Sequence, residues 1–262
     1  MLRPLITLTT DFGRADHFVA VMKAVILSLC PKAAIVDISH ETPAFDITEG
    51  AFILAEAYRW FPKKTIHVAV IDPGVGAARR PILLEAAGQY FLAPDNGLLT
   101  LVCRREKHRA REVASERFFL KPVSQTFHGR DVFAPCAAHL ANGTPPGRFG
   151  KLINDHFRLF IPEPAQTGKR VWTGAVLKID RFGNLITNFP FEEFQRISAR
   201  PFEMAVGMEK VTRLARNYAE GATGEVFLIA GSSGYLEVAA NQASAAKLLG
   251  CGVGAPAELT IW

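Results

Sequence analysis

Hydrophobic and polar positions alternate between two periodicities in the first part of the chain. Residues 5–12 form a mostly apolar run typical of a buried strand, and residues 17–30 carry apolar side chains at helical spacing. The pair of patterns recurs, with a strand predicted over 33–39, a helix over 46–61 and a strand over 65–76. This order predicts parallel strands joined by right-handed crossovers.

The pattern changes in the middle of the chain. Short strands over 81–85 and 90–93 and a helix over 133–141 precede a segment, 145–168, in which prolines and glycines cluster. Beyond it, short β-rich segments alternate with turn signals and helical periodicity is scarce. We therefore expect an α/β N-terminal domain with a mainly parallel sheet (1–163) and a smaller C-terminal antiparallel β domain (164–262).

Composition indicates a globular protein. Hydrophobic residues make up 49% and charged residues 21% of the 262 positions. No apolar run approaches the roughly 20 residues of a membrane-spanning helix, and the N-terminal run resembles a first strand more than a signal peptide. We expect a cytoplasmic protein without a membrane partner. Four well-separated cysteines predict reduced thiols, since no CxxC pair occurs.

The net charge of +5 raises the question of nucleic-acid binding. The densest basic stretch, 104–111, is interrupted by Glu106 and contains no aromatic residue. Proteins that bind single strands usually combine positive charge with stacking rings. This stretch therefore favours a solvated helix end or loop, and no nucleic-acid partner is expected.

Carboxylates lie at the ends of the first three predicted strands. Asp11, Asp37 and Asp72 occupy these positions, and glycine-bearing turns follow Asp11 and Asp72. Ligands of parallel α/β sheets bind beyond the carboxyl ends of the strands. A single Asp before a turn more often bonds its own backbone, but two at one sheet edge favour a site. No phosphate-binding fingerprint such as G-x-G-x-x-G occurs, so nucleotide phosphate is not the expected ligand.

Other polar positions carry weaker signals. His128 precedes a glycine, which lets a ligand approach closely, although a lone histidine is more often structural. Asp180, Phe182 and Asn184 lie in one predicted turn and Ser232 in another, where simple hairpin chemistry is the competing explanation. No H-x-H or HExxH spacing is present, so we expect no metal site.

The order of several motifs indicates a family. TTDFG, VDISHE, DPGVG, APDNGLL, TFHGRDVFAP, GNLITN and GSSGYLE follow one another over nearly the whole chain. Together they resemble the S-adenosyl-L-methionine (SAM) hydroxide adenosyltransferases, relatives of the fluorinases and chlorinases. The resemblance implies a hydrolase that converts SAM and water into adenosine and L-methionine without a cofactor. It also implies a homotrimer with its substrate sites between subunits.

The resemblance also assigns roles to residues. Asp72, Arg79 and His128 match the trio that activates water. Asp11 matches the residue that binds the ribose hydroxyls, and Phe45 lies nearby. The remaining matches are Asp16, Asp180 and Ser232 for the methionine amine and carboxylate, with Asn184 and Phe182 for the adenine.

Several alternatives stay open at this point. The halide-using relatives carry an uncharged residue where Asp72 stands and lack the histidine, so water is the expected nucleophile over chloride or fluoride. A metal-dependent hydrolase using Asp11, Asp72 and His128 is a weaker alternative. A module that binds nucleoside without turnover is a third. The physiological role, the preferred sulfonium epimer and the final acceptor of the water proton are not legible in the sequence.

Overall fold

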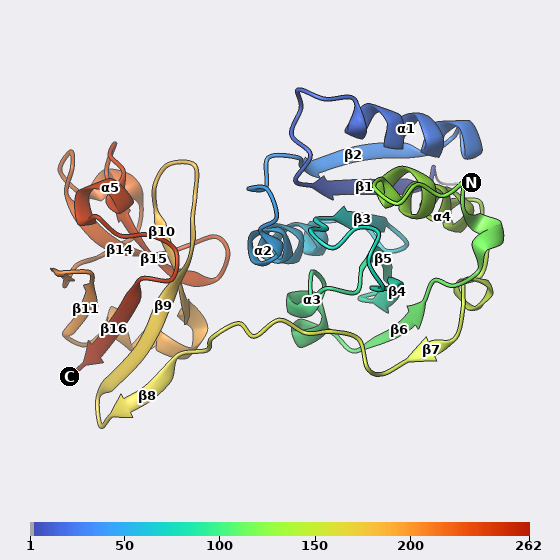
Figure 1. Cartoon of the computed structure of the whole chain (residues 1–262). Helices are drawn as coiled ribbons and strands as arrows, with labels where there is room; N and C mark the ends of the chain where they lie inside the picture. Colours follow the sequence, from blue (N-terminus) through green and yellow to red (C-terminus); the bar gives the residue numbers. More distant parts are fainter. Residues whose placement is uncertain (1–2) are drawn as a thin grey trace. The chain divides into compact units, whose positions relative to one another are not determined.

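The computed structural model describes residues 3–262 and divides the chain into two compact units, with the first ending at Phe160 and the second spanning Ile161–Trp262 (Figure 1). All four cysteines are free thiols, and three of them are buried, as the spacing predicts. None of the helices in the described part of the chain combines the length and apolar character that crossing a bilayer requires.

The first unit is built on one sheet, with strand order β2-β1-β3-β5-β4-β6-β7 over the residues described. Its strands are β1 (Leu5–Thr10), β2 (Ala34–Ser39), β3 (Ile66–Val70), β4 (Pro81–Ala86), β5 (Gln89–Pro94), β6 (His108–Glu112) and β7 (Leu152–Ile153). The pairs β1–β2, β1–β3 and β3–β5 are parallel. Each of these pairs is joined by a crossover of many residues, which parallel pairing requires.

The other half of this sheet corrects the expectation of a mainly parallel arrangement. β4 pairs antiparallel with both β5 and β6, and β6 pairs antiparallel with β7. The reason is a tight turn between β4 and β5, in which Ala87 and Gly88 both have positive φ, 53° and 74°. A two-residue turn of this type joins neighbouring antiparallel strands. The first unit is therefore mixed α/β.

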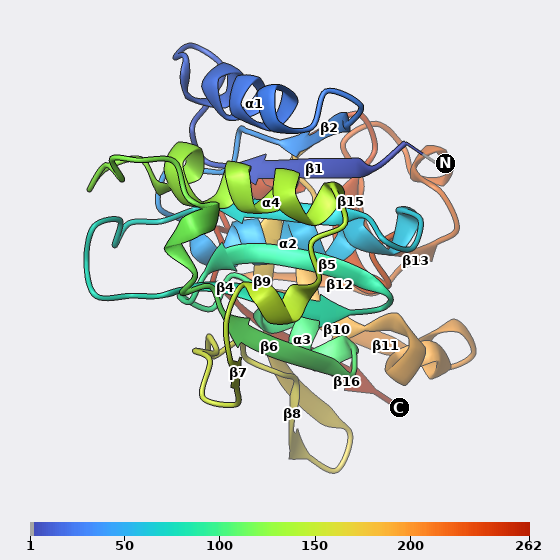
Figure 2. The same cartoon turned by 90° about the vertical axis from the view of Figure 1, so that its right-hand side faces the viewer.

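Helices cover both faces of the sheet (Figure 2). α1 (Phe18–Leu29) and α4 (Ala134–Ala141) pack together on one face, and α2 (Ile47–Ala57) packs with α3 (Thr100–Arg105) on the other. α2 begins where the sequence predicts, because Asp46 accepts a hydrogen bond from the Glu49 amide at 2.9 Å. Short helical turns complete the unit: η1 (Tyr58–Trp60), η2 (Glu116–Phe118), η3 (Gly129–Phe133) and η4 (Pro146–Arg148).

The second unit is a β unit with one larger sheet. Its path is β12-β11-β16-β9-β10-β15-β14-β13, and β8 pairs with β9. Among the described strands, the pairs are antiparallel except β13–β14. The strands are β8 (Ala165–Gly168), β9 (Val171–Ile179), β10 (Leu185–Pro190), β11 (Phe202–Val206), β12 (Glu209–Val211), β13 (Leu214–Ala215), β14 (Val226–Ala230), β15 (Tyr235–Ala240) and β16 (Pro256–Ile261), accompanied by η5 (Phe191–Ser198), η6 (Tyr218–Glu220) and α5 (Ala245–Leu249).

Candidate active site

A buried ion pair lies just beyond the carboxyl end of β3. The side chains of Asp72 and Arg79 are only 4% and 11% exposed. Arg79 donates from Nε to Asp72 Oδ1 at 2.5 Å and from Nη2 to Oδ2, so the contact is bidentate. A guanidinium in this geometry favours the ionised carboxylate. Burial lowers the pKa of Arg79 to about 10, which leaves it protonated at neutral pH.

His128 joins this pair from a distant part of the chain. It is half-buried at the start of η3, and its Nδ1 lies 3.4 Å from Arg79 Nη2. Burial, and next the positive charge of Arg79, lower the pKa of His128 below its ordinary 6.5, although Asp131 and a backbone hydrogen bond at Ser124 oppose the shift. The imidazole is therefore neutral at pH 7, with the lone pair of Nδ1 facing the Arg79 guanidinium.

A glycine permits the close approach of the two segments. Gly76, in the turn between Asp72 and Arg79, has φ +82°, and a Cβ placed on it would lie 2.4 Å from the carbonyl oxygen of Gln125. Gln125 belongs to the segment that leads into His128. Only glycine fits here on both grounds, conformation and space. The DPGVG motif thus owes its second glycine to the packing of the two segments.

Asp11 and Phe45 meet at the end of β1. The backbone amide of Phe45 donates to Asp11 Oδ2 at 2.9 Å. Phe45 has φ +69°, unusual for a residue with a bulky side chain, and its side chain is 70% exposed. Strained backbone of this kind often accompanies functional sites. Asp16 lies in the exposed turn between β1 and α1.

In the second unit, Asp180 organises the hairpin between β9 and β10. Its Oδ1 accepts from the amides of Phe182 and Asn184, each at 2.9 Å, and its Oδ2 accepts from Asn184 Nδ2 at 2.9 Å. Gly183 has φ +87°, and a Cβ there would collide with Ser244 Oγ at 2.0 Å. The turn therefore fixes a buried Asn184 beside a Phe182 ring that is 78% exposed.

Ser232 is exposed in the turn between β14 and β15. On β15, Glu237 is a residue that sequence reasoning missed. It is 5% exposed, and burial, followed by the charge of Asp180, raises its pKa. Ser233 Oγ and Tyr218 Oη lie 3.4 and 3.5 Å from its carboxylate. The sequence could have indicated Glu237 as a functional residue, because it is the one charged position in an otherwise apolar strand, YLEVAA. Buried carboxylates are rare without a partner.

Within the first unit, Asp72, Arg79 and His128 form one group and Asp11 contacts Phe45. Within the second unit, Asp180 holds Phe182 and Asn184 in one turn. An ionised carboxylate beside a neutral imidazole can orient a water molecule and take its proton. The carboxylate of Asp180 suits a cationic group, whereas burial and the charge of Asp180 favour the neutral form of Glu237. This fold and these side chains define the class of protein as an enzyme of two compact units that acts on a small molecule.

Comparison with known proteins gives the family. The sequence model for the SAM hydroxide adenosyltransferase N-terminal domain matches residues 6–150, and the model for the corresponding C-terminal domain matches residues 174–258. The chain belongs to the SAM hydroxide adenosyltransferase family.

Individual relatives agree with this assignment. The chain is 38% identical to the (R)-S-adenosyl-L-methionine hydrolase of Thermus thermophilus, with 98% of this chain and all of the relative covered. A fluorinase from an Actinoplanes species is 29% identical, with 92% of each chain covered. A crystal structure of an uncharacterized conserved protein from Thermotoga maritima superposes with a TM-score of 0.92 at 36% identity, covering 97% of this chain and 99% of that one.

Proposed function

We propose that this protein hydrolyses SAM to adenosine and L-methionine and acts on the (R) form that its relatives' name specifies. The observation that carries the proposal is the Asp72–Arg79–His128 group, which has the chemistry that activation of water requires. A halide ion would be repelled by the Asp72 carboxylate, whereas water can donate a proton to it. The nucleophile is therefore water.

The reaction needs no metal or acid at the leaving group. The sulfonium of SAM is positively charged and departs as a neutral thioether. The water oxygen forms a bond to C5′ while the C5′–S bond breaks. The electron pair of the broken C5′–S bond stays on sulfur. The enzyme must place the water in line and exclude bulk solvent. We therefore propose that no cofactor takes part.

The three side chains have different roles toward the water molecule. Asp72 and His128 orient the water and take its proton as the C–O bond forms. Arg79 holds the Asp72 carboxylate ionised through its Nε and Nη2 contacts. Its Nη1 is buried with no partner among the described residues, and we assign to it a hydrogen bond to the water oxygen. General-base help of this kind contributes roughly 10²–10⁴-fold in rate.

The remaining residues bind the substrate. We assign the ribose hydroxyls to Asp11, because a carboxylate accepts from two vicinal hydroxyls at once, with Phe45 beside it. We assign the methionine ammonium and carboxylate to Asp16, Asp180 and Ser232. We assign the adenine to Asn184 and Phe182. Assembly into a homotrimer and a cytoplasmic location stay predictions from the family resemblance and the sequence.

Product analysis tests the activity. Purified protein is incubated with SAM in four conditions, with and without chelator and chloride, and the products are separated by chromatography. Equal amounts of adenosine and methionine in all four conditions are the expected result. A chlorinated nucleoside would assign the protein to the halogenases. Tight adenosine binding with intact SAM would replace the enzyme by a binding module.

A further inference from the structure

A second group of reactive side chains lies elsewhere in the first unit. Cys103 is on α3, His108 begins β6, and His156 belongs to the loop after β7. One potential ligand atom from each side chain, a sulfur and two ring nitrogens, lies within 4.8 Å of the other two. None of these residues belongs to the catalytic group proposed above.

The two imidazoles border an open cavity of about 480 Å³. Their ring centroids are 5.3 Å apart and the rings are nearly perpendicular, at 83°. Cys103 is 8% exposed and does not line this cavity, so its sulfur lies behind the two rings as the buried member of the group.

The hydrogen bonds of the two rings differ: His108 is held through Nδ1, whereas His156 Nε2 faces the Arg158 guanidinium, which can only donate. His108 Nδ1 lies 2.9 Å from the Glu106 carbonyl oxygen, which only accepts, so Nδ1 carries the proton and Nε2 presents a lone pair. Histidines that bind metals are commonly oriented by such a bond from the second nitrogen. His156 is 9% exposed, and its Nδ1 is buried with no partner in the described chain.

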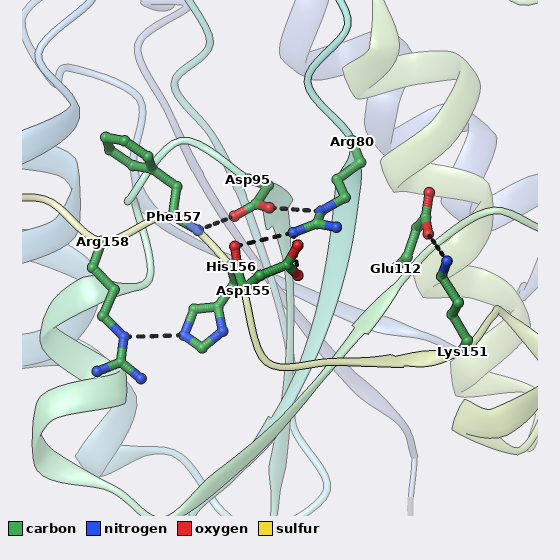
Figure 3. A network of polar contacts seen from close by, with 8 residues as sticks. All are labelled: Arg80, Asp95, Glu112, Lys151, Asp155, His156, Phe157 and Arg158. Carbon is green, nitrogen blue, oxygen red and sulfur yellow. Dashed lines mark hydrogen bonds and ion pairs between the residues drawn. The ribbon is translucent and has the colours of Figure 1, made fainter.

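The loop that carries His156 is held in place from both sides (Figure 3). Arg80 bridges Asp95 and Asp155, with nitrogen–oxygen distances of 2.8 and 2.7 Å, and Asp95 also accepts from the Phe157 amide at 2.7 Å. The Leu159 amide donates to Thr100 Oγ1 at 2.9 Å, which ties the loop to α3. His156 is thus fixed against the helix that carries Cys103.

We propose that Cys103, His108 and His156 bind a transition-metal ion of the zinc class, with one coordination position left to water. Sulfur and imidazole nitrogen are the ligands that Zn²⁺ prefers, and bonds of about 2.3 and 2.0 Å bring neighbouring ligand atoms to about 3.5 Å apart. The three ligand atoms lie within 4.8 Å of one another, and small rotations of the two rings into the cavity bring them to this shorter separation. On binding, the Cys103 sulfur replaces its proton by the metal, and the proton is released to solvent.

The positive charge of Arg158 affects the affinity of the proposed site for a metal ion. Arg158 Nε lies 3.4 Å from His156 Nε2. Arg158 can only donate, so the neutral His156 ring accepts at Nε2, and metal binding through this nitrogen requires the guanidinium to move aside. The same guanidinium repels a cation, and Arg158 is exposed, so its repulsion is screened. Removing its charge should therefore strengthen metal binding modestly.

This site departs from the expectation of no metal. The sequence spacing carries no known signature, since Cys103 and His108 are separated from His156 by most of β6, a helix and β7. Only the tertiary fold brings the third ligand to the other two. The proposal does not depend on the hydrolase activity.

Cobalt titration tests the site, because a cobalt–thiolate bond produces a charge-transfer absorption band. Chelator-treated full-length protein should bind one Co²⁺ with this band, and Zn²⁺ should displace it. Cys103→Ser should abolish the band, whereas Cys251→Ser, a matched change of a cysteine in the second unit, should keep it. His108→Ala should weaken Zn²⁺ binding by at least about tenfold. Arg158→Gln should strengthen it by about two- to fivefold.

Two results would overturn the proposal. One is wild-type protein that binds neither ion at one equivalent, and the other is a charge-transfer band that persists in Cys103→Ser. Circular dichroism establishes that each variant is folded. If Cys103→Ser does not fold, the partly exposed His108→Ala decides the matter, and unchanged Zn²⁺ affinity in that variant contradicts the site.

Discussion

Arg79 contacts both neighbours in the proposed catalytic group. Its bidentate contact favours the charged form of Asp72. Burial, and next the positive charge of Arg79, disfavour the charged form of His128.

At the residue scale, the ionised carboxylate is the first feature to test. Asp72→Asn keeps the shape of the side chain and removes its charge, so kcat should fall roughly 10²–10⁴-fold while the circular dichroism spectrum is unchanged. Asp95→Asn is the matched control, because Asp95 pairs with the adjacent Arg80 at 2.8 Å. Steady-state kinetics should show a near-normal kcat for the control, and an equal loss in both variants would contradict a specific role for Asp72.

The pKa of His128 predicts a pH dependence. An imidazole must be unprotonated to act as a base, so activity is present above its pKa and lost as pH falls through it. Burial and Arg79 lower this pKa, while Asp131 and the Ser124 backbone raise it, with a net shift below 6.5. The acid limb of kcat/KM should therefore have its midpoint below pH 6.5. The residual activity of His128→Asn should lack this limb; an identical limb in the variant would assign the titration to another group.

At the element scale, the loop after β3 and the segment before η3 act as one unit. Gly76→Ala adds a methyl group that meets the Gln125 carbonyl oxygen at 2.4 Å. Gly143→Ala is the matched control, since Gly143 has φ +93° and nothing lies within 4 Å of the point where the added methyl group would stand. Thermal unfolding should show a cost of about 1–2 kcal/mol for the control, from the left-handed backbone alone.

For Gly76→Ala we expect a larger loss of stability together with a fall in kcat, because separation of the two segments moves Arg79 away from His128. Unfolding curves and steady-state kinetics of the two variants give the comparison. If Gly76→Ala loses no more stability than Gly143→Ala and keeps its kcat, the two segments do not support each other as described.

The elements themselves differ in how far sequence predicts them. The alternation of strands and helices up to β3 follows from periodicity, because each strand is a nearly continuous apolar run and each helix has a buried stripe. The antiparallel half of the first sheet does not follow from periodicity. It depends on a turn in which Ala87 and Gly88 both have positive φ, and the sequence signals this conformation only at the glycine. The short β7 carries too few residues to show a period.

The contacts of the site are less predictable than its elements. Arg79 and His128 are 49 positions apart, and no spacing rule links them. Their association was expected from the family resemblance and not from the pattern of residues. The Cys103–His108–His156 group was not expected at all, because its third member reaches the others only through tertiary packing.

At the scale of the whole molecule, the two units supply different parts of the proposed chemistry. The first carries the proposed water-activating group, and the second carries Asp180, a proposed partner of the methionine ammonium. The family models match each unit separately, over residues 6–150 and 174–258. We therefore propose one chemical step for the whole protein: water attacks C5′ of SAM.

Hydrolysis in ¹⁸O-labelled water tests this claim most directly. Products of a complete reaction are separated and their masses are measured. Attack of water on C5′ predicts one labelled oxygen in adenosine, none in L-methionine, and equal amounts of the two products. Unlabelled adenosine, or label in the amino-acid product, would contradict the proposed reaction.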